Sequence, residues 1–220
     1  MKTRNLTLSL APLALLACAL LALSLGLGGC AKQKPAFAPS SSVSIGIGGF
    51  YQPQNTRQLL AGYMPEEVDQ VDQKIFPQLD HDFESMLREH TDRDYVGSAT
   101  SYECMIKHRQ GDYTSAFAFW MDVGKCMNVD LILVPQVQSW RERQGGDLGV
   151  EVPAAVTMDF FLLDVNNQAL IARSRYDEAQ AALASNLLNV GKFFSRGGKW
   201  VTAHELAQEG MIKAIKELGL

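Results

Sequence analysis

The sequence predicts an α/β fold, in which a mixed β-sheet packs with helices and includes a C-terminal antiparallel β-hairpin followed by two helices. Three observations favour this fold. Strand-like alternation and helix-like spacing of apolar residues take turns along the chain, as in layered α/β domains. Residues 131–134 are all apolar, which is typical of a central strand covered on both faces. The turn-forming residues 164–168 separate two strand-like segments, which predicts a hairpin.

Residues 1–29 are predicted to be a secretory signal peptide. Lys2 and Arg4 supply a basic start, residues 6–27 carry no charge, and the segment ends in Leu27-Gly28-Gly29-Cys30. Basic start, apolar centre and small residues before the cut are the parts of an export signal. A Cys directly after the cut is typical of the bacterial lipobox, so we expect a diacylglycerol on Cys30. A transmembrane helix is the alternative, since about 20 apolar residues suffice, but the glycines fit processing better.

Residues 30–42 are predicted to be a lipidated flexible tether. The stretch is rich in Pro, Ser and Ala and has little to bury. Several acyl chains would anchor it stably in a membrane. By resemblance to enterobacterial lipoproteins, Ala31 in place of Asp indicates the outer membrane, with the folded part facing the periplasm. The inner membrane and the cell surface are the alternatives.

Charge and length limit the classes of function. Removing Lys2 and Arg4 with the signal leaves 18 basic against 24 acidic residues, a net charge of −6. An acidic protein is a poor candidate for binding nucleic acid or for broad adhesion to anionic lipids. The remaining length predicts one α/β domain over residues 43–220, with a helical extension over 177–220.

Two cysteines remain after processing and lipidation, Cys104 and Cys126. In an oxidising compartment they either pair as a disulfide or stay as two buried thiols, and the sequence leaves both open. Their separation of 22 positions does not fit a compact metal motif.

The first half of the domain shows four elements. We expect a strand over residues 43–48 and a helix from Pro65 to about Glu89, kinked or split by Pro77. Residues 95–107 read as a strand, and residues 113–127 as a helix that Asp112 caps.

The second half begins with the central strand over residues 129–137, where Pro135 should lie at a bulge or an unpaired stretch. Residues 140–147 read as a polar loop, and residues 153–165 and 169–176 as the hairpin strands. A helix is expected over residues 177–194. Thr202 and Glu205 have the spacing of a capping box that starts the last helix.

Two segments are candidates for partner binding. One holds Trp140, Arg141 and Arg143, and the other holds Trp200. Trp and Arg are enriched at energetically important interface positions. The alternatives are a solvated loop for the first segment and, for the second, a helix end whose aromatic residues fold into the core.

No catalytic or metal-binding motif is present in the sequence. His81, His90, His108 and His204 have no ligand spacing, and HExxH, CxxC, GxGxxG and the GxSxG elbow are absent. We therefore expect no metal, no cofactor and no enzymatic activity.

The stretch from Asn128 carries a resemblance to a known family. Asn128-Val129-Asp130 leads into the apolar strand, and Leu162-Leu163-Asp164-Val165 leads into the hairpin turn. This resembles periplasmic lipoproteins of the TolB-amino-terminal/CsgG/LpoB type, although the glycines of both family motifs are missing. Residues 176–186 and 197–202 are similar to uncharacterised lipoproteins of delta-proteobacteria.

The resemblance implies a non-catalytic adaptor or assembly factor that binds another envelope protein. A periplasmic hydrolase acting on cell wall or lipid is the alternative, supported by location alone. Self-assembly into a ring is a third hypothesis.

Overall fold

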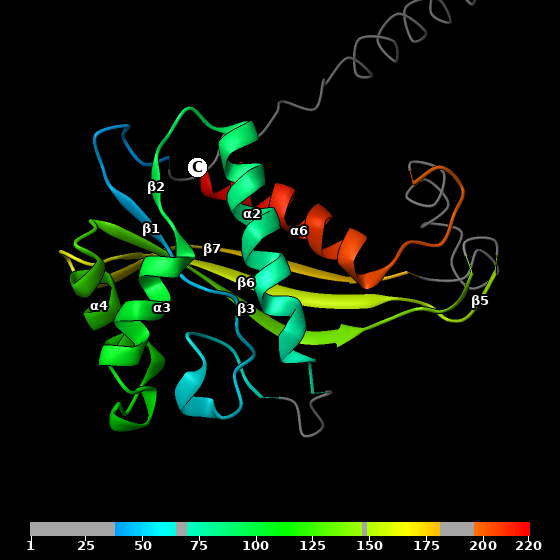
Figure 1. Ribbon diagram of the computed structural model, residues 1–220, viewed down its shortest axis with the longest axis horizontal. Coiled ribbons are helices and arrows are strands. Elements are labelled where there is room, and N and C mark those ends of the chain that lie inside the picture. The colour runs from blue at the N-terminus through cyan, green and yellow to red at the C-terminus, as the bar shows by residue number, and fades with distance from the viewer. Residues whose placement is uncertain (1–37, 65–69, 147–148, 181–195) are drawn as a thin grey trace, which may run out of the picture. The chain divides into compact units, whose positions relative to one another are not determined.

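The computed structural model describes residues 38–64, 70–146, 149–180 and 196–220. Its centre is a five-stranded sheet in the order β2-β1-β3-β6-β7 (Figure 1). The strands of this sheet are β1 (Ile45–Ile47), β2 (Tyr95–Val96), β3 (Leu131–Arg141), β6 (Ala155–Asp164) and β7 (Ala169–Ala179).

The sheet is mixed, as the sequence predicted. β1 runs parallel to β2 and β3, whereas β3, β6 and β7 are antiparallel to one another. Pro135 lies on β3 between Leu133, whose carbonyl accepts from Gly48, and Val137, whose N–H donates to Tyr51. Because backbone directions alternate, the missing N–H of Pro135 faces the gap between these two bonds. Pro135 is paired in register with Phe160 of β6, so the predicted unpaired stretch is present only on the β1 side.

Helices cover both faces of the sheet (Figure 1). α2 (Phe76–His90) and α6 (Ala203–Leu218) share a buried core with one face, and α3 (Ser98–Lys107) and α4 (Ala116–Met127) with the other. β6 supplies both cores: Phe160 faces α2 and α6, and Phe161 faces α3 and α4. The mixed sheet between helices and the hairpin followed by a helix are therefore confirmed.

Two predicted boundaries in the first half were wrong. Residues 95–107 are a two-residue strand followed by α3, not one strand. α4 begins at Ala116, and Ser115 caps it by accepting from the N–H of Ala118. Asp112 instead ends the short 3-10 helix η3 (Gln110–Asp112).

Pro77 does not kink a helix. α2 begins at Phe76, so Pro77 occupies its first turn, where no intrahelical bond needs the missing N–H. The short 3-10 helices η1 (Thr56–Gln58) and η2 (Gln73–Ile75) precede it. The helix start expected at Pro65 lies outside the described residues.

The predicted loop over residues 140–147 is largely β-structure. β3 continues to Arg141, and β4 (Gln144–Gly146) pairs antiparallel with β5 (Gly149–Val152) as a separate two-stranded arm. β4 is exposed along its length, so hydrogen bonding rather than burial defines this strand.

The C-terminal part combines a correction with a confirmation. Residues 177–179, predicted to start a helix, belong to β7, and residues 181–195 lie outside the description. Thr202 and Glu205 form the predicted capping box at the start of α6. None of the helices in the described ranges is long and apolar enough to cross a membrane.

Candidate partner-binding surface

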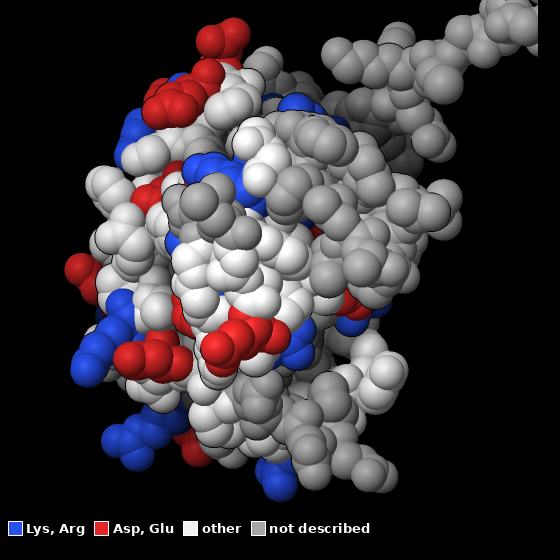
Figure 2. All heavy atoms as spheres, turned by 90° about the vertical axis from the view of Figure 1, so that its right-hand side faces the viewer, with Lys and Arg blue, Asp and Glu red and all other residues white. Residues whose placement is uncertain are grey.

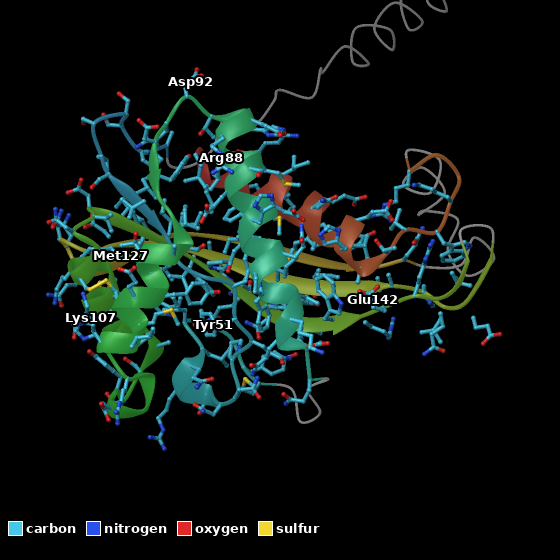
Figure 3. All side chains as sticks on the ribbon, viewed as in Figure 1. Tyr51, Arg88, Asp92, Lys107, Met127 and Glu142 are labelled. Carbon is cyan, nitrogen blue, oxygen red and sulfur yellow. A yellow bond between two sulfur atoms is a disulfide. The ribbon has the colours of Figure 1, made fainter. Side chains whose placement is uncertain are left out.

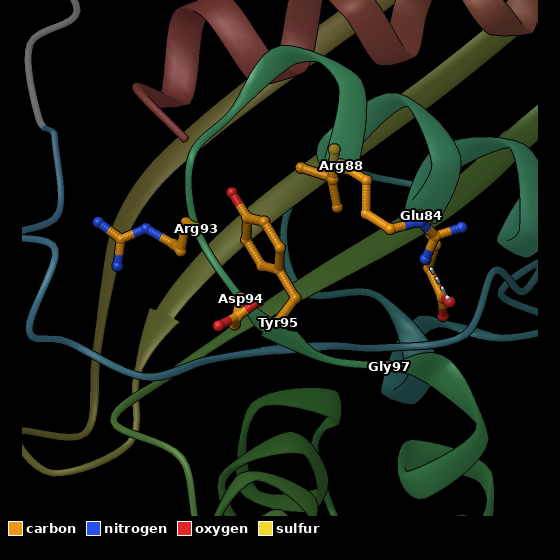
Figure 4. Close-up of a pocket in the computed structure, with 7 residues that line it drawn as sticks. Glu84, Arg88, Arg93, Asp94, Tyr95 and Gly97 are labelled. Carbon is orange, nitrogen blue, oxygen red and sulfur yellow. Dashed lines mark ion pairs between the residues drawn. The ribbon is translucent and has the colours of Figure 1, made fainter.

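Arg93 hydrogen-bonds the first described residues of the chain to the folded domain. Arg93, which precedes β2, donates from Nη1 to the carbonyl of Val43 at 2.7 Å and from Nη2 to the carbonyls of Pro39 and Ser40, each at 2.7 Å. In Figure 4 its guanidinium points away from Arg88, toward the N-terminal segment. A small cavity of about 110 Å³ lies beside it. The place where residues 39–43 join the domain is therefore fixed by three charge-assisted bonds.

The candidate residues Trp140, Arg143 and Trp200 lie at one end of the molecule. Arg143 donates from Nη1 to the carbonyl of Trp200, although the two are far apart in sequence. Glu142 sits between the segments: it accepts from Trp140 Nε1 at 2.9 Å and from the N–H of Ala203, at the start of α6, at 3.3 Å. Figure 3 shows Glu142 at the end of the sheet opposite Lys107 and Met127. We call this group the β3–α6 junction.

The four candidates differ in exposure. Arg141 is exposed, with Nε donating to the carbonyl of Pro153 at 3.2 Å, whereas Trp140 is partly buried against the larger core. Arg143 and Trp200 are also partly buried. The structure thus brings both predicted segments together, and only Arg141 among the four is an open surface residue.

A charged groove that the sequence did not indicate runs between β7 and α6. It has a volume of about 680 Å³ and is lined by Arg175, Tyr176, Asp177, Glu178, Arg196, Glu209 and Lys213. Arg196 donates to both carboxylate oxygens of Glu209, at 2.8 and 2.7 Å, and lies 3.3 Å from Glu178. The hydrogen bond from Arg196 to Glu209 raises the pKa of the guanidinium, and burial, followed by the charge of Glu209, raises the pKa of the Tyr176 phenol.

A second charged cluster lies on the other face of β6 and β7. Asp159 is almost fully buried and accepts from Arg173 Nε at 2.9 Å and from Arg175 Nη1 at 3.0 Å. The Arg173 guanidinium also stacks 5.3 Å from the Phe161 ring centre. A buried carboxylate is tolerated only when it is paired and hydrogen bonded. The burial of Asp159 therefore explains why the two arginines lie beside it.

Cys104 and Cys126 form a disulfide in the structure, with a Cα–Cα distance of 5.8 Å. It joins α3 to α4 across the smaller of the two cores. Cys30, the predicted lipidation site, lies outside the described residues.

Two carboxylates of α2, Asp80 and Asp82, form hydrogen bonds that connect this helix to other elements of the fold. Asp80 accepts from the N–H of Phe50 and from the Tyr102 hydroxyl, and burial raises its pKa. His204 Nε2 lies 2.6 Å from Asp82, which links α6 to α2. In the parts of the chain that the structure describes, no three His, Cys, Asp or Glu side chains are grouped as metal ligands.

Comparison with known proteins finds similarity only among solved structures. No family model and no curated protein matches the sequence. The chain is similar to a PelC dodecamer subunit from Paraburkholderia phytofirmans, with 14% identity, 86% of this chain and 94% of that chain covered, and a TM-score of 0.45. It is similar to lipoprotein GNA1162 from Neisseria meningitidis, with 14% identity, 71% and 95% covered, and a TM-score of 0.41. The LpoB C-terminal domain from Salmonella enterica gives 8% identity, 74% and 94% covered, and 0.38.

Proposed function

We propose that this chain is a lipid-anchored envelope protein that faces the periplasm and acts as a non-catalytic adaptor or assembly factor for another envelope protein. The observation that carries the proposal is the N-terminal sequence, with its basic start, uncharged apolar stretch and Leu27-Gly28-Gly29-Cys30. Ala31 favours the outer membrane as the site of the anchor.

The tether limits where the partner lies. Eight residues, 31–38, lie between the lipidated Cys30 and Pro39, whose carbonyl accepts from Arg93. At about 3.4 Å per extended residue, this length spans at most about 30 Å. The folded domain therefore stays close to the bilayer, and we expect its partner to be a membrane protein or a protein held at the membrane surface.

The β3–α6 junction is the proposed partner surface. Arg141 is exposed there, the adjoining β4–β5 arm is largely open to solvent, and Glu142 holds the end of β3 against α6. Figure 2, which views the molecule from this side, shows basic and acidic side chains interspersed. Mixed charge beside the partly buried Trp140 and Trp200 suits a specific protein contact better than general adhesion to a charged surface.

In-cell photo-crosslinking tests the proposal. A photoreactive amino acid replaces Arg141 in one strain and Lys107, which is exposed at the opposite end, in a control strain. We expect the Arg141 probe to capture one defined envelope protein, and the Lys107 probe not to capture it. The proposal fails if the Arg141 probe yields only the abundant proteins that the control also yields.

A further inference from the structure

The outer edge of β7 has the features of a self-pairing surface. β7 is the last strand of the sheet, and within the described ranges no strand pairs with its outer side. The N–H of Gln180 donates to Ala154, so even-numbered residues of this stretch bond toward β6 and odd-numbered residues point outward. The outward carbonyl of Arg175 accepts from Lys213 Nζ of α6 at 2.6 Å. Asp177 therefore offers its backbone groups to a further strand, whereas the Arg175 carbonyl already accepts from Lys213 and offers a strand only its second lone pair.

Charge along this edge decides which strand fits. Arg173, Arg175, Asp177 and Glu178 are charged, and β7 carries a bulge near Ile171, two features by which sheets avoid indiscriminate edge pairing. An antiparallel copy of β7 centred on Tyr176 would place Arg175 directly opposite Asp177 of the second copy, and Asp177 opposite its Arg175. Centring one residue earlier would place each Asp177 opposite an Arg173 but would oppose Arg175 to itself. Of these two registers, the one centred on Tyr176 avoids a like-charge pair and is favoured.

The helix layer permits this arrangement. α6 packs over both β6 and β7, and Gly210 lies directly above Tyr176, where an added Cβ would come within 2.8 Å of the ring. With strands about 4.8 Å apart, two copies of α6 placed above their own β6–β7 pairs would lie about 10 Å apart, a normal helix packing distance. Lys213 would then face the stretch of the second α6 that holds Glu209, a residue of opposite charge.

We propose that two copies of this chain associate through antiparallel pairing of their β7 edges, with α6 packed against α6. The sheet becomes continuous across the pair, and the β7–α6 groove of about 680 Å³ becomes the interface. This inference goes beyond the adaptor function and does not depend on the identity of the partner protein.

Thiol crosslinking of the full chain in its native membrane tests the contact. Across the proposed pair, the two positions 177 are diagonal neighbours with Cβ atoms about 8 Å apart, within reach of a short bis-maleimide. Asp177→Cys should give a covalent dimer, and Asp92→Cys, at an exposed position in the loop before β2, should give none. The wild-type chain is the control for lipidation, because a Cys30 thiol without lipid would itself react and give a crosslinked dimer. A crosslinked wild-type dimer would therefore indicate failure of the anchor, whereas no dimer from either chain would indicate failure of the β7 contact. Equal yields at both positions, or none at position 177, would overturn the proposal.

Light scattering of the detergent-solubilised full chain gives the second readout. We expect two copies per particle. Asp177→Arg replaces two attractive pairs with two repulsive ones and should weaken dimerisation on the order of 30-fold, whereas Asp92→Arg should leave it unchanged. Arg175 is kept because it also holds the buried Asp159. A monomer, a larger ring, or equal effects of the two variants would contradict β7 pairing.

Discussion

Removal of the disulfide between α3 and α4 gives the most quantitative test of the fold. The perturbation is Cys104→Ala with Cys126→Ala. The bond closes a loop with a sequence separation of 22 residues. In the chain-entropy model, a loop of this length restricts the unfolded state by about 3 kcal/mol at 25 °C. For a domain of this size, that loss corresponds to a fall in Tm of about 10 °C.

Urea unfolding with the bond intact, with the bond reduced, and in the double variant measures the effect. The reduced chain and the double variant should both lose about 3 kcal/mol of unfolding free energy, and their m-values should rise because the unfolded chain without the crosslink exposes more surface. Reduction alone is the control for packing, since Cys104 is only 2% exposed and its replacement also alters the core. A loss below about 1 kcal/mol on reduction would refute the entropic reasoning.

Three further predictions concern single residues. Asp159→Ala should lower the unfolding free energy by about 1–3 kcal/mol in chemical denaturation, because it removes the charged hydrogen bonds from Arg173 and Arg175, whose side chains are 33% and 46% exposed and stay solvated. Hydrogen bonds, first from the backbone N–H of Ser44, lower the pKa of Asp130 below its ordinary value of 3.8. The stability that the ionised Asp130 adds is therefore complete above pH 3.8, the pKa in the unfolded chain, and is lost as the pH falls through the lower pKa of the folded state. The difference between wild type and Asp130→Asn should therefore shrink in acid-unfolding curves below pH 3.8. Gly124→Ala should destabilise by about 1–3 kcal/mol in thermal melts, since its Cβ would lie 2.5 Å from Val165.

Hydrophobic periodicity predicted the parts of the fold that bury large side chains. β6 shows this directly: Phe160 and Phe161 alternate between the two cores, as the pattern of the strand indicates. α3 failed the same test because its buried positions include Ser98 and Ser101, while Tyr102 and Ile106 are exposed. A helix that buries small polar residues and exposes large apolar ones produces a pattern with no clear helical phase.

The charged sites depend on contacts that no local pattern encodes. The sequence places Trp140 and Trp200 as candidates, but only the tertiary structure shows that Glu142 bonds to both Trp140 and the start of α6. The sequence does not indicate the β7–α6 groove, because the helical spacing after Tyr176 predicts a helix where the structure has the end of the edge strand. Strand pairing with β6 overrides the helical spacing at Asp177 to Ala179.

The mass of the N-terminal peptide of the membrane-bound protein is the most direct test of cleavage before Cys30 and of lipidation at its thiol. We expect a chain that begins at Cys30 and carries a diacylglycerol and an amide-linked acyl chain, and we expect Cys30→Ser to release the protein from the membrane fraction. A chain that begins at Met1, or one with an unmodified thiol at position 30, would contradict this expectation.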